Sequence, residues 1–191
     1  GDRTVIRPMP GGRRPAGASP PPSAPPDGPG RPAALILPGG TGLNPLVESA
    51  AALLGLASQL RSSVAHPDPA GLRDRVLEGM RRFEADARAK GITDAVVLPA
   101  RYALCSLLDE TVLATPWGSE SLWSKQGLLI TFHNEAWGGE KFFALLQRLL
   151  AYPAGNLDLL ELMYLCLALG FEGRYRVRDG GRTQLDQLRE Q

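Results

Sequence analysis

Two neighbouring stretches decide the fold: NPLVESAAALLGLASQLRSSV at residues 44–64 and DPAGLRDRVLEGMRRFEADARAKG at residues 68–91. Each begins with a polar residue followed by proline. The side chains of Asn44 and Asp68 can accept hydrogen bonds from the free N–H groups at a helix start, and proline suits the first helical position. Apolar residues then recur every three or four positions. The pattern predicts two amphipathic helices, the second ending near Gly91, and each needs a partner for its apolar face.

The apolar faces of these two helices can be named residue by residue. The first comprises Leu46, Ala50, Leu53, Leu54, Ala57, Leu60 and Val64, and the second comprises Leu72, Val76, Met80, Phe83 and Ala87. The charged residues of the second helix lie elsewhere on its surface. Both faces are therefore expected to be buried.

Helical signals continue through the rest of the chain. A third helix is expected to end near Thr115, and Thr93 and Leu98 are alternative starts because Pro99 fits only a first turn. The remaining expected helices span Leu122–His133, a segment after Gly138-Gly139 that reaches Leu150, Asn156–Leu169 and Thr183–Arg189, with a loop over residues 173–181. The Asn156–Leu169 helix is apolar nearly all round, which predicts a central position. No alternation of period two persists, so the sequence predicts an all-α fold.

Residues 1–43 differ sharply in composition from the rest. They hold eleven of the 17 prolines and nine of the 22 glycines, and five arginines against two aspartates give them a net charge of +3. Such a segment cannot bury enough apolar surface to offset the entropy cost of ordering it. We expect a disordered arm, whose apolar patch Leu35-Ile36-Leu37 could lie against the core, followed by one helical domain over residues 44–191.

The overall composition is that of a soluble globular protein. Of 191 residues, 43% are hydrophobic and 21% are charged. No run approaches the ~20 apolar residues that a membrane-spanning helix needs. A net charge of +1 gives no electrostatic basis for binding nucleic acid. Cys105 and Cys166 lie in apolar helical patterns, so we expect free thiols packed in the core, as in a reducing compartment.

Few residues could support catalysis. Zinc sites need several His, Cys or carboxylate ligands at suitable spacing, but the chain has two histidines and no Cys-x-x-Cys, and it lacks a phosphate-binding P-loop. Neither a metal nor a cofactor is therefore expected. Cys105 and His133 are the candidate pair for a catalytic nucleophile and its general base. Neighbouring leucines should bury Cys105 and raise the pKa of its thiol, which favours core packing. His133 is expected to bind carbonyls or a carboxylate at a helix end.

Asp109 and Glu110 form the carboxylate pair of greatest interest. Adjacent helical residues point about 100° apart, so these two do not share a proton as a catalytic dyad does. Pairing of one carboxylate with Arg101 or Lys125 and exposure on an ordinary helix face both fit the spacing. Three tryptophans follow at positions 117, 123 and 137. Any exposed one would be a good anchor for a partner, because tryptophan is enriched at interface hot spots.

Five motifs occur in order: YALCSLLDE at 102–110, TPWG at 115–118, FHNE at 132–135, GGEKFF at 138–143 and LGFEGRY at 169–175. In order and spacing they resemble the DotU/TssL (IcmH/DotU) family, and the resemblance covers about residues 44–178. It implies a hook-like cytoplasmic domain of two small three-helix bundles. It also implies a transmembrane helix near the C-terminus, sometimes with a periplasmic domain beyond. We therefore expect this chain to be a soluble cytoplasmic fragment, attached to the inner membrane only through a helix beyond Gln191.

The resemblance further implies a non-enzymatic scaffold of a type VI secretion system. In that role the domain docks the cytoplasmic baseplate to the inner membrane, through an IcmF/TssM-type membrane protein and the baseplate components TssK and TssE. Two alternatives stay open: a DotU-type component of a type IV secretion system, and an unrelated helical adaptor that uses its Pro-rich arm. Self-association is also left open.

Two groups of residues are the predicted protein-binding sites under this resemblance. The first comprises Asp109, Glu110, Thr115, Pro116 and Trp117, and the second, which could instead be architectural, comprises His133, Glu135 and Glu140. Glycines 138, 139, 170 and 173 are expected at turns or helix ends. Charge reversal at Asp109 and Glu110 is expected to weaken baseplate binding with little change in melting temperature.

Overall fold

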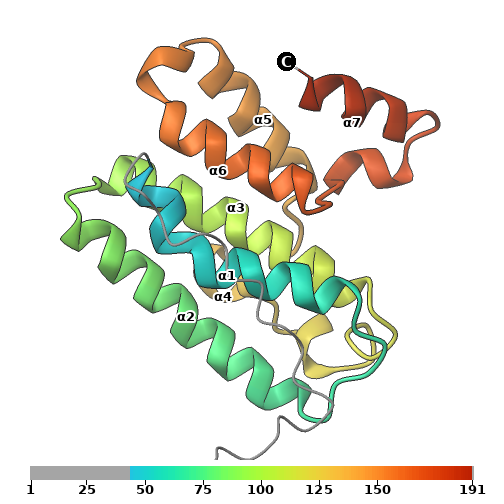
Figure 1. Cartoon of the computed structure of the whole chain (residues 1–191). Coiled ribbons are helices and arrows are strands. Elements are labelled where there is room, and N and C mark those ends of the chain that lie inside the picture. Colours follow the sequence, from blue (N-terminus) through green and yellow to red (C-terminus); the bar gives the residue numbers. More distant parts are fainter. Residues whose placement is uncertain (1–43, 191) are drawn as a thin grey trace, which may run out of the picture. The chain divides into compact units, whose positions relative to one another are not determined.

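The computed structural model describes residues 44–190, which form α-helices and short 3-10 helices and contain no β-strand (Figure 1). The expected all-α fold is confirmed. The arm expected over residues 1–43 lies outside the described residues. The elements are α1 (Pro45–Arg61), α2 (Pro69–Ala89), α3 (Asp94–Leu113), η1 (Leu122–Ser124), α4 (Leu128–His133), α5 (Gly139–Leu150), η2 (Pro153–Gly155), α6 (Leu157–Ala168), η3 (Gly173–Val177) and α7 (Gly181–Arg189).

The first two helices begin where the sequence predicts. The Asn44 side chain accepts hydrogen bonds from the backbone N–H groups of Leu46 and Val47, each at 3.0 Å. Asp68 accepts one from Gly71 at 2.9 Å. Such bonds satisfy N–H groups that have no partner within the helix. The predicted apolar faces are buried, except that Val64 lies beyond the end of α1 and is 80% exposed.

Helix α3 occupies the centre of the described domain. It packs against α1 and α2, which also contact each other, so α1–α3 form a three-helix bundle (Figure 1). It also contacts α4, α5 and α6. Twelve of its 20 residues are buried. The Asn156–Leu169 helix, which was predicted to be central, is so only in part: α6 contacts α1, α3, α5 and α7, but it exposes Leu157 and Tyr164 to solvent.

Pro99 does not mark the start of α3. The helix begins at Asp94, with Thr93 at the N-cap position, so Pro99 lies inside it. Proline removes the hydrogen bond to the carbonyl of the residue four positions earlier, which is Ala95. Ala95 is exposed. Water can therefore satisfy that carbonyl, and the helix continues through the proline.

The expected helix over Leu122–His133 is two elements. The 3-10 helix η1 ends at Ser124, and α4 starts only at Leu128. The break is stabilised by contacts from α3, described below. The segment expected as a loop over residues 173–181 contains η3, and the last helix starts at Gly181 rather than Thr183.

Helices α5, α6 and α7 form a second group, in which α6 contacts both of the others. At the end of α6, the Arg61 guanidinium donates to the Leu169 carbonyl at 2.8 Å. A Cβ at Gly170 would overlap that guanidinium, and Gly170 also has a φ of +101°, so only glycine fits there. Arg189 of α7 donates to the Leu167 carbonyl at 2.6 Å. Among the helices over residues 44–190, none has both the length and the apolar character needed to span a bilayer.

Candidate functional site

Asp109 projects from the middle of α3 into the interior and is only 7% exposed. One carboxylate oxygen accepts hydrogen bonds from the Trp123 indole N–H at 2.7 Å and the Leu128 N–H at 2.8 Å, and the other accepts from the Leu129 N–H at 2.8 Å. The last two donors belong to the first turn of α4. Asp109 therefore caps α4 from a different helix and determines where α4 begins.

Gly127 makes this approach possible. A Cβ at this position would lie 2.9 Å from an Asp109 carboxylate oxygen, too close for an ordinary contact. Burial raises the pKa of Asp109 above its ordinary value, while the bonds from Leu129, Leu128 and Trp123 act in the opposite direction. The carboxyl group is thus costly to bury and is retained by its hydrogen bonds.

Glu110 makes a parallel contact on the other side of α3. Its two carboxylate oxygens accept hydrogen bonds from the Glu172 N–H at 2.7 Å and the Gly173 N–H at 2.8 Å. Gly173 has a φ of +50° and begins η3. Burial raises the pKa of Glu110, against the lowering effect of these two bonds. Glu110 therefore attaches the start of η3 to α3.

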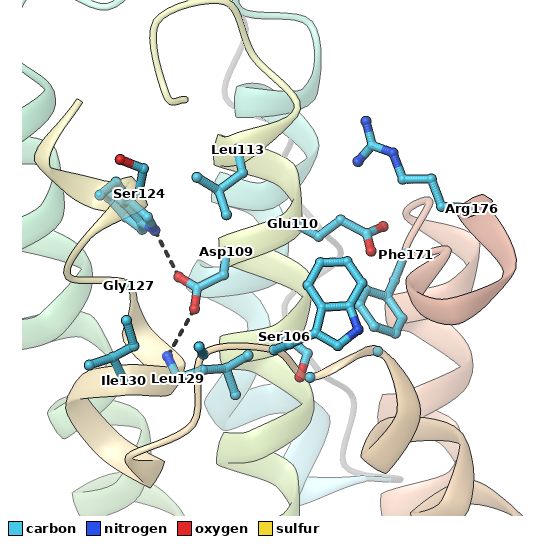
Figure 2. A pocket seen from close by; sticks show the side chains of 15 residues that line it. Ser106, Asp109, Glu110, Leu113, Ser124, Gly127, Leu129, Ile130, Phe171 and Arg176 are labelled. Atoms are coloured by element: carbon cyan, nitrogen blue, oxygen red, sulfur yellow. Dashed lines mark hydrogen bonds between the residues drawn. The ribbon is translucent and has the colours of Figure 1, made fainter. Parts of the chain in front are cut away.

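Figure 2 shows the two carboxylates pointing away from each other, Asp109 toward η1 and α4 and Glu110 toward Phe171 and Arg176. This agrees with the expectation that adjacent helical residues do not form a dyad. The suggested pairing with Arg101 was wrong, because the Arg101 guanidinium binds the Glu84 carboxylate at 2.9 Å. An ordinary exposed helix face is also excluded by the burial of Asp109.

A cleft lies beside this part of α3, with walls formed by α4 and by the turn that leads into α5 (Figure 2). Its volume is about 80 Å³. Sites for small molecules are usually ~300–1,000 Å³, so this cleft fits a side chain of a partner better than a substrate. Three apolar residues that line it are exposed: Leu113, Ile130 and Trp137, the last at 55%. These three are called the cleft rim below.

Two glycines allow the wall at Trp137 to approach α3 closely. A Cβ at Gly138 would lie 2.4 Å from the Ser106 hydroxyl, and one at Gly139 would lie 2.8 Å from the Trp137 indole nitrogen. Neither glycine has a positive φ. Their role is therefore close packing at the start of α5, and the Trp137 indole lies against Gly139. In the sequence Trp137 is one of three tryptophans with nothing to distinguish it. The structure separates them, because Trp123 is buried, Trp117 is half-buried and Trp137 is exposed.

The predicted corner at His133 and Glu135 lies on another side of α3. His133 ends α4, and its ring contacts the Tyr102 ring edge-to-face with centroids 4.9 Å apart. Its Nε2 accepts a hydrogen bond from the Arg101 guanidinium at 3.4 Å. The partner of His133 is therefore a cationic side chain and not the carbonyl or carboxylate that the sequence predicted. Burial, reinforced by the charges of Arg101 and Lys141, lowers the pKa of His133 to about 4. The neutral imidazole is the form that this contact requires.

Glu135 and Glu140 both pair with charged side chains near the surface. Glu135 accepts hydrogen bonds from the Tyr102 hydroxyl, at 2.9 Å, and from the Lys141 ammonium. Burial, followed by the bond to Glu135, raises the pKa of Tyr102. Glu140 lies in the first turn of α5, as expected, and its carboxylate is 3.3 Å from the Arg174 guanidinium. These contacts connect α3, α5 and η3.

The Thr115–Gly118 turn does not line the cleft. The Thr115 hydroxyl donates to the Val112 carbonyl at 2.6 Å and accepts from the Gly118 N–H at 3.0 Å, which closes the end of α3. The Trp117 indole donates to the Ser63 carbonyl at 3.4 Å. Pro116 is exposed. The structure thus brings Asp109 and Glu110 together with Gly138 and Gly139, and places the Thr115–Trp117 group apart from them.

The geometry offers no activated nucleophile at Cys105. Its side chain is fully buried, and burial raises the pKa of its thiol well above the ordinary value. Cys166 is also buried, and both thiols are free. Within residues 44–190, no group of three or more His, Cys, Asp or Glu side chains is arranged to hold a metal ion.

The fold and cleft define an all-helical domain whose central helix fixes the surrounding elements through buried carboxylates. The family described as "Type VI secretion system protein DotU" matches residues 45–191. The chain therefore belongs to the DotU family of type VI secretion system proteins, as the sequence motifs indicated. A search of curated protein sequences returned no match.

Solved structures agree with this assignment. The chain is 37% identical to TssL from Vibrio cholerae, over 77% of this chain and 92% of that one, with a TM-score of 0.70. It is 26% identical to the cytoplasmic domain of TssL from Acinetobacter baumannii, over 78% and 93%, with a TM-score of 0.72. For SciP/TssL from enteroaggregative Escherichia coli 042 the identity is 27%, over 70% and 78%, with a TM-score of 0.63.

Proposed function

We propose that this domain is a docking module at the cytoplasmic face of the bacterial inner membrane and that the cleft rim contacts the secretion baseplate. Family membership supports a role in a type VI secretion system rather than a type IV system. The observation that carries the proposal is the exposure of Leu113, Ile130 and Trp137 around one small cleft. Exposed apolar residues that cluster on a surface usually mark an interaction site.

Asp109 and Glu110 have a positioning role in this proposal. Their carboxylates accept hydrogen bonds from α4 and from the start of η3, so they are occupied within the domain. Asp109 fixes α4, which carries Ile130, against α3, which carries Leu113, and Glu110 fixes the start of η3 against α3. A partner that binds the rim would therefore meet a preformed surface, and little conformational entropy of this domain would be lost on binding.

The partners that we propose are the baseplate components TssK and TssE at the cleft, and an IcmF/TssM-type membrane protein elsewhere on the domain. The small volume of the cleft and the burial of Cys105 support a scaffold rather than an enzyme. The Pro-rich arm is not needed for the baseplate contact in this proposal.

A binding measurement on full-length protein tests the proposal. Trp137→Ala should weaken binding to purified TssK or TssE at least ~30-fold, as expected for a hot-spot tryptophan worth ~2 kcal/mol or more. Tyr152→Ala is the matched control, because Tyr152 is an aromatic residue that is 69% exposed and does not line the cleft. Equal affinities of the two variants for both partners would show that the cleft rim is not the docking surface.

A further inference from the structure

A second apolar surface lies on the outer side of α6, away from the cleft. A groove of about 590 Å³ runs between α5, α6 and α7. Its apolar lining includes Leu146, Leu150, Leu157, Leu160, Tyr164 and Leu188, of which Leu157 and Tyr164 are more than half exposed. A concave apolar surface of this size normally has an occupant.

The described part of the chain begins at the edge of this groove. The Asn44 side-chain amide donates to the Glu161 carboxylate at 2.7 Å and to the Asp158 carbonyl at 3.1 Å. Asp158 and Glu161 are themselves part of the groove lining. Asn44, the first described residue, is therefore fixed at the rim of the groove.

The sequence immediately before Asn44 suits the groove. Residues 35–43, LILPGGTGL, contain four apolar side chains, Leu35, Ile36, Leu37 and Leu43, and no charged residue. They would therefore not bring an unpaired charge into an apolar site. Three glycines in PGGTG give the backbone the freedom to reverse direction. Leu43 also lacks the usual apolar partner four positions into α1, because that residue is Glu48.

The distances allow the contact. Leu37 is seven residues from Asn44. At ~3.3 Å per residue an extended segment of that length reaches ~23 Å. The groove follows α6 from Leu157 to Leu167. Those ten residues rise only ~15 Å, at 1.5 Å each. The apolar triplet can therefore reach any point along the groove.

We propose that residues 35–43 bind in the groove between α5, α6 and α7, with Leu35, Ile36 and Leu37 covering Leu157 and Tyr164. A tethered segment meets its site at an effective concentration on the order of millimolar. It therefore outcompetes a second copy of the chain at micromolar concentration. The segment shields the apolar lining of the groove, and the contact does not depend on the proposed baseplate role.

Thiol labelling of the full-length chain tests this contact. In Tyr164→Cys the new thiol lies in the groove, whereas Cys105 and Cys166 are fully buried and should react slowly. The labelling rate is compared with and without the additional change Leu35→Ser, Ile36→Ser, Leu37→Ser. The matched control is Val5→Ser, Ile6→Ser, which removes apolar residues from the same N-terminal region. The native thiols of Cys105 and Cys166, which only unfolding can expose, report any general loosening.

The triple change should accelerate labelling at position 164 at least ~5-fold, the ratio expected if the segment occupies the groove about four-fifths of the time. The control pair should leave the labelling rate at position 164 unchanged, and the triple change should leave the slow labelling of Cys105 and Cys166 unchanged. Equal rates with and without the triplet would overturn the assignment. Protection that grows with protein concentration would also overturn it, by showing that a second copy fills the groove. Equal acceleration at Cys105 or Cys166 would overturn it as a general unfolding effect.

Discussion

The carboxylates of this domain fall into two regions with different roles. Asp109 and Glu110 on α3 are buried or half-buried and bind backbone N–H groups of distant elements. Glu135 and Glu140, near the start of α5, bind cationic side chains closer to the surface. A buried carboxylate that loses its donors keeps its desolvation cost, whereas an exposed one is solvated again by water. The first pair should therefore determine stability, and the second should contribute little.

The largest expected effect is that of Asp109→Lys. It places an ammonium group opposite three N–H donors in a site that is 7% exposed. We expect the free energy of unfolding to fall by ~4 kcal/mol or more. Chemical denaturation measures it, with Glu140→Lys as the exposed control. Burial thus leads us to expect a clear loss of stability, contrary to the sequence-based expectation of little change in melting temperature. A wild-type midpoint for Asp109→Lys would contradict the burial of this residue.

Substitution by a neutral amide distinguishes the contribution of Asp109 to stability from that of Glu110. In Asp109→Asn one oxygen becomes an NH2 group that faces an N–H donor, whichever way the amide is turned. We expect a loss of ~1–3 kcal/mol in unfolding free energy, and a smaller loss for Glu110→Gln, which binds two donors instead of three. Denaturant midpoints of the two variants test the order. A larger loss for Glu110→Gln would mean that η3 matters more to the fold than α4.

His133 provides a pH-dependent effect of intermediate size. Its pKa is about 4 in the folded protein against an ordinary 6.5, because burial disfavours the charged imidazole. Between these values the unfolded chain binds a proton that the folded chain does not. The stability due to this residue is therefore complete above about pH 6.5 and is lost as the pH falls toward about 4.

His133→Gln should remove this pH dependence, on the order of 1 kcal/mol for a partly solvated group. The measurement is the difference in unfolding free energy between wild type and variant from pH 7 to pH 4. The raised pKa values of Asp109 and Glu110 act in the opposite direction, stabilising the fold as the pH falls, but they are common to both proteins and cancel in the difference. A flat difference would contradict the lowered pKa of His133.

The smallest expected effect is that of Glu140→Gln. Its carboxylate is 65% exposed and pairs with Arg174 at 3.3 Å. Ion pairs of this kind are worth ~0.5 kcal/mol or less. Thermal unfolding should therefore show nearly the wild-type midpoint at 0.15 M salt. A loss comparable to that of Asp109→Asn would remove the distinction between the two regions.

The sequence predicted the features that depend on local chemistry. Asn44-Pro45 and Asp68-Pro69 start helices because the cap and the residues that it binds are neighbours in the chain. The break between η1 and α4 was missed because its cause, Asp109, lies 19 residues before Leu128. The exposed outer face of α6 could not be predicted from the apolar sequence of this helix, because burial depends on which other helices pack against each of its faces. For the same reason the exposure of Trp137 required the structure.

Site-specific photo-cross-linking in the assembled secretion complex tests the central proposal most directly. A photoreactive amino acid is placed at Trp137 in the cleft rim and, in a second protein, at Tyr152 on the other helical group. The proposed docking surface predicts a covalent product with TssK or TssE from position 137 and none from position 152. A baseplate product from position 152 alone would contradict it and would place the docking surface on the α5–α6 side of the domain.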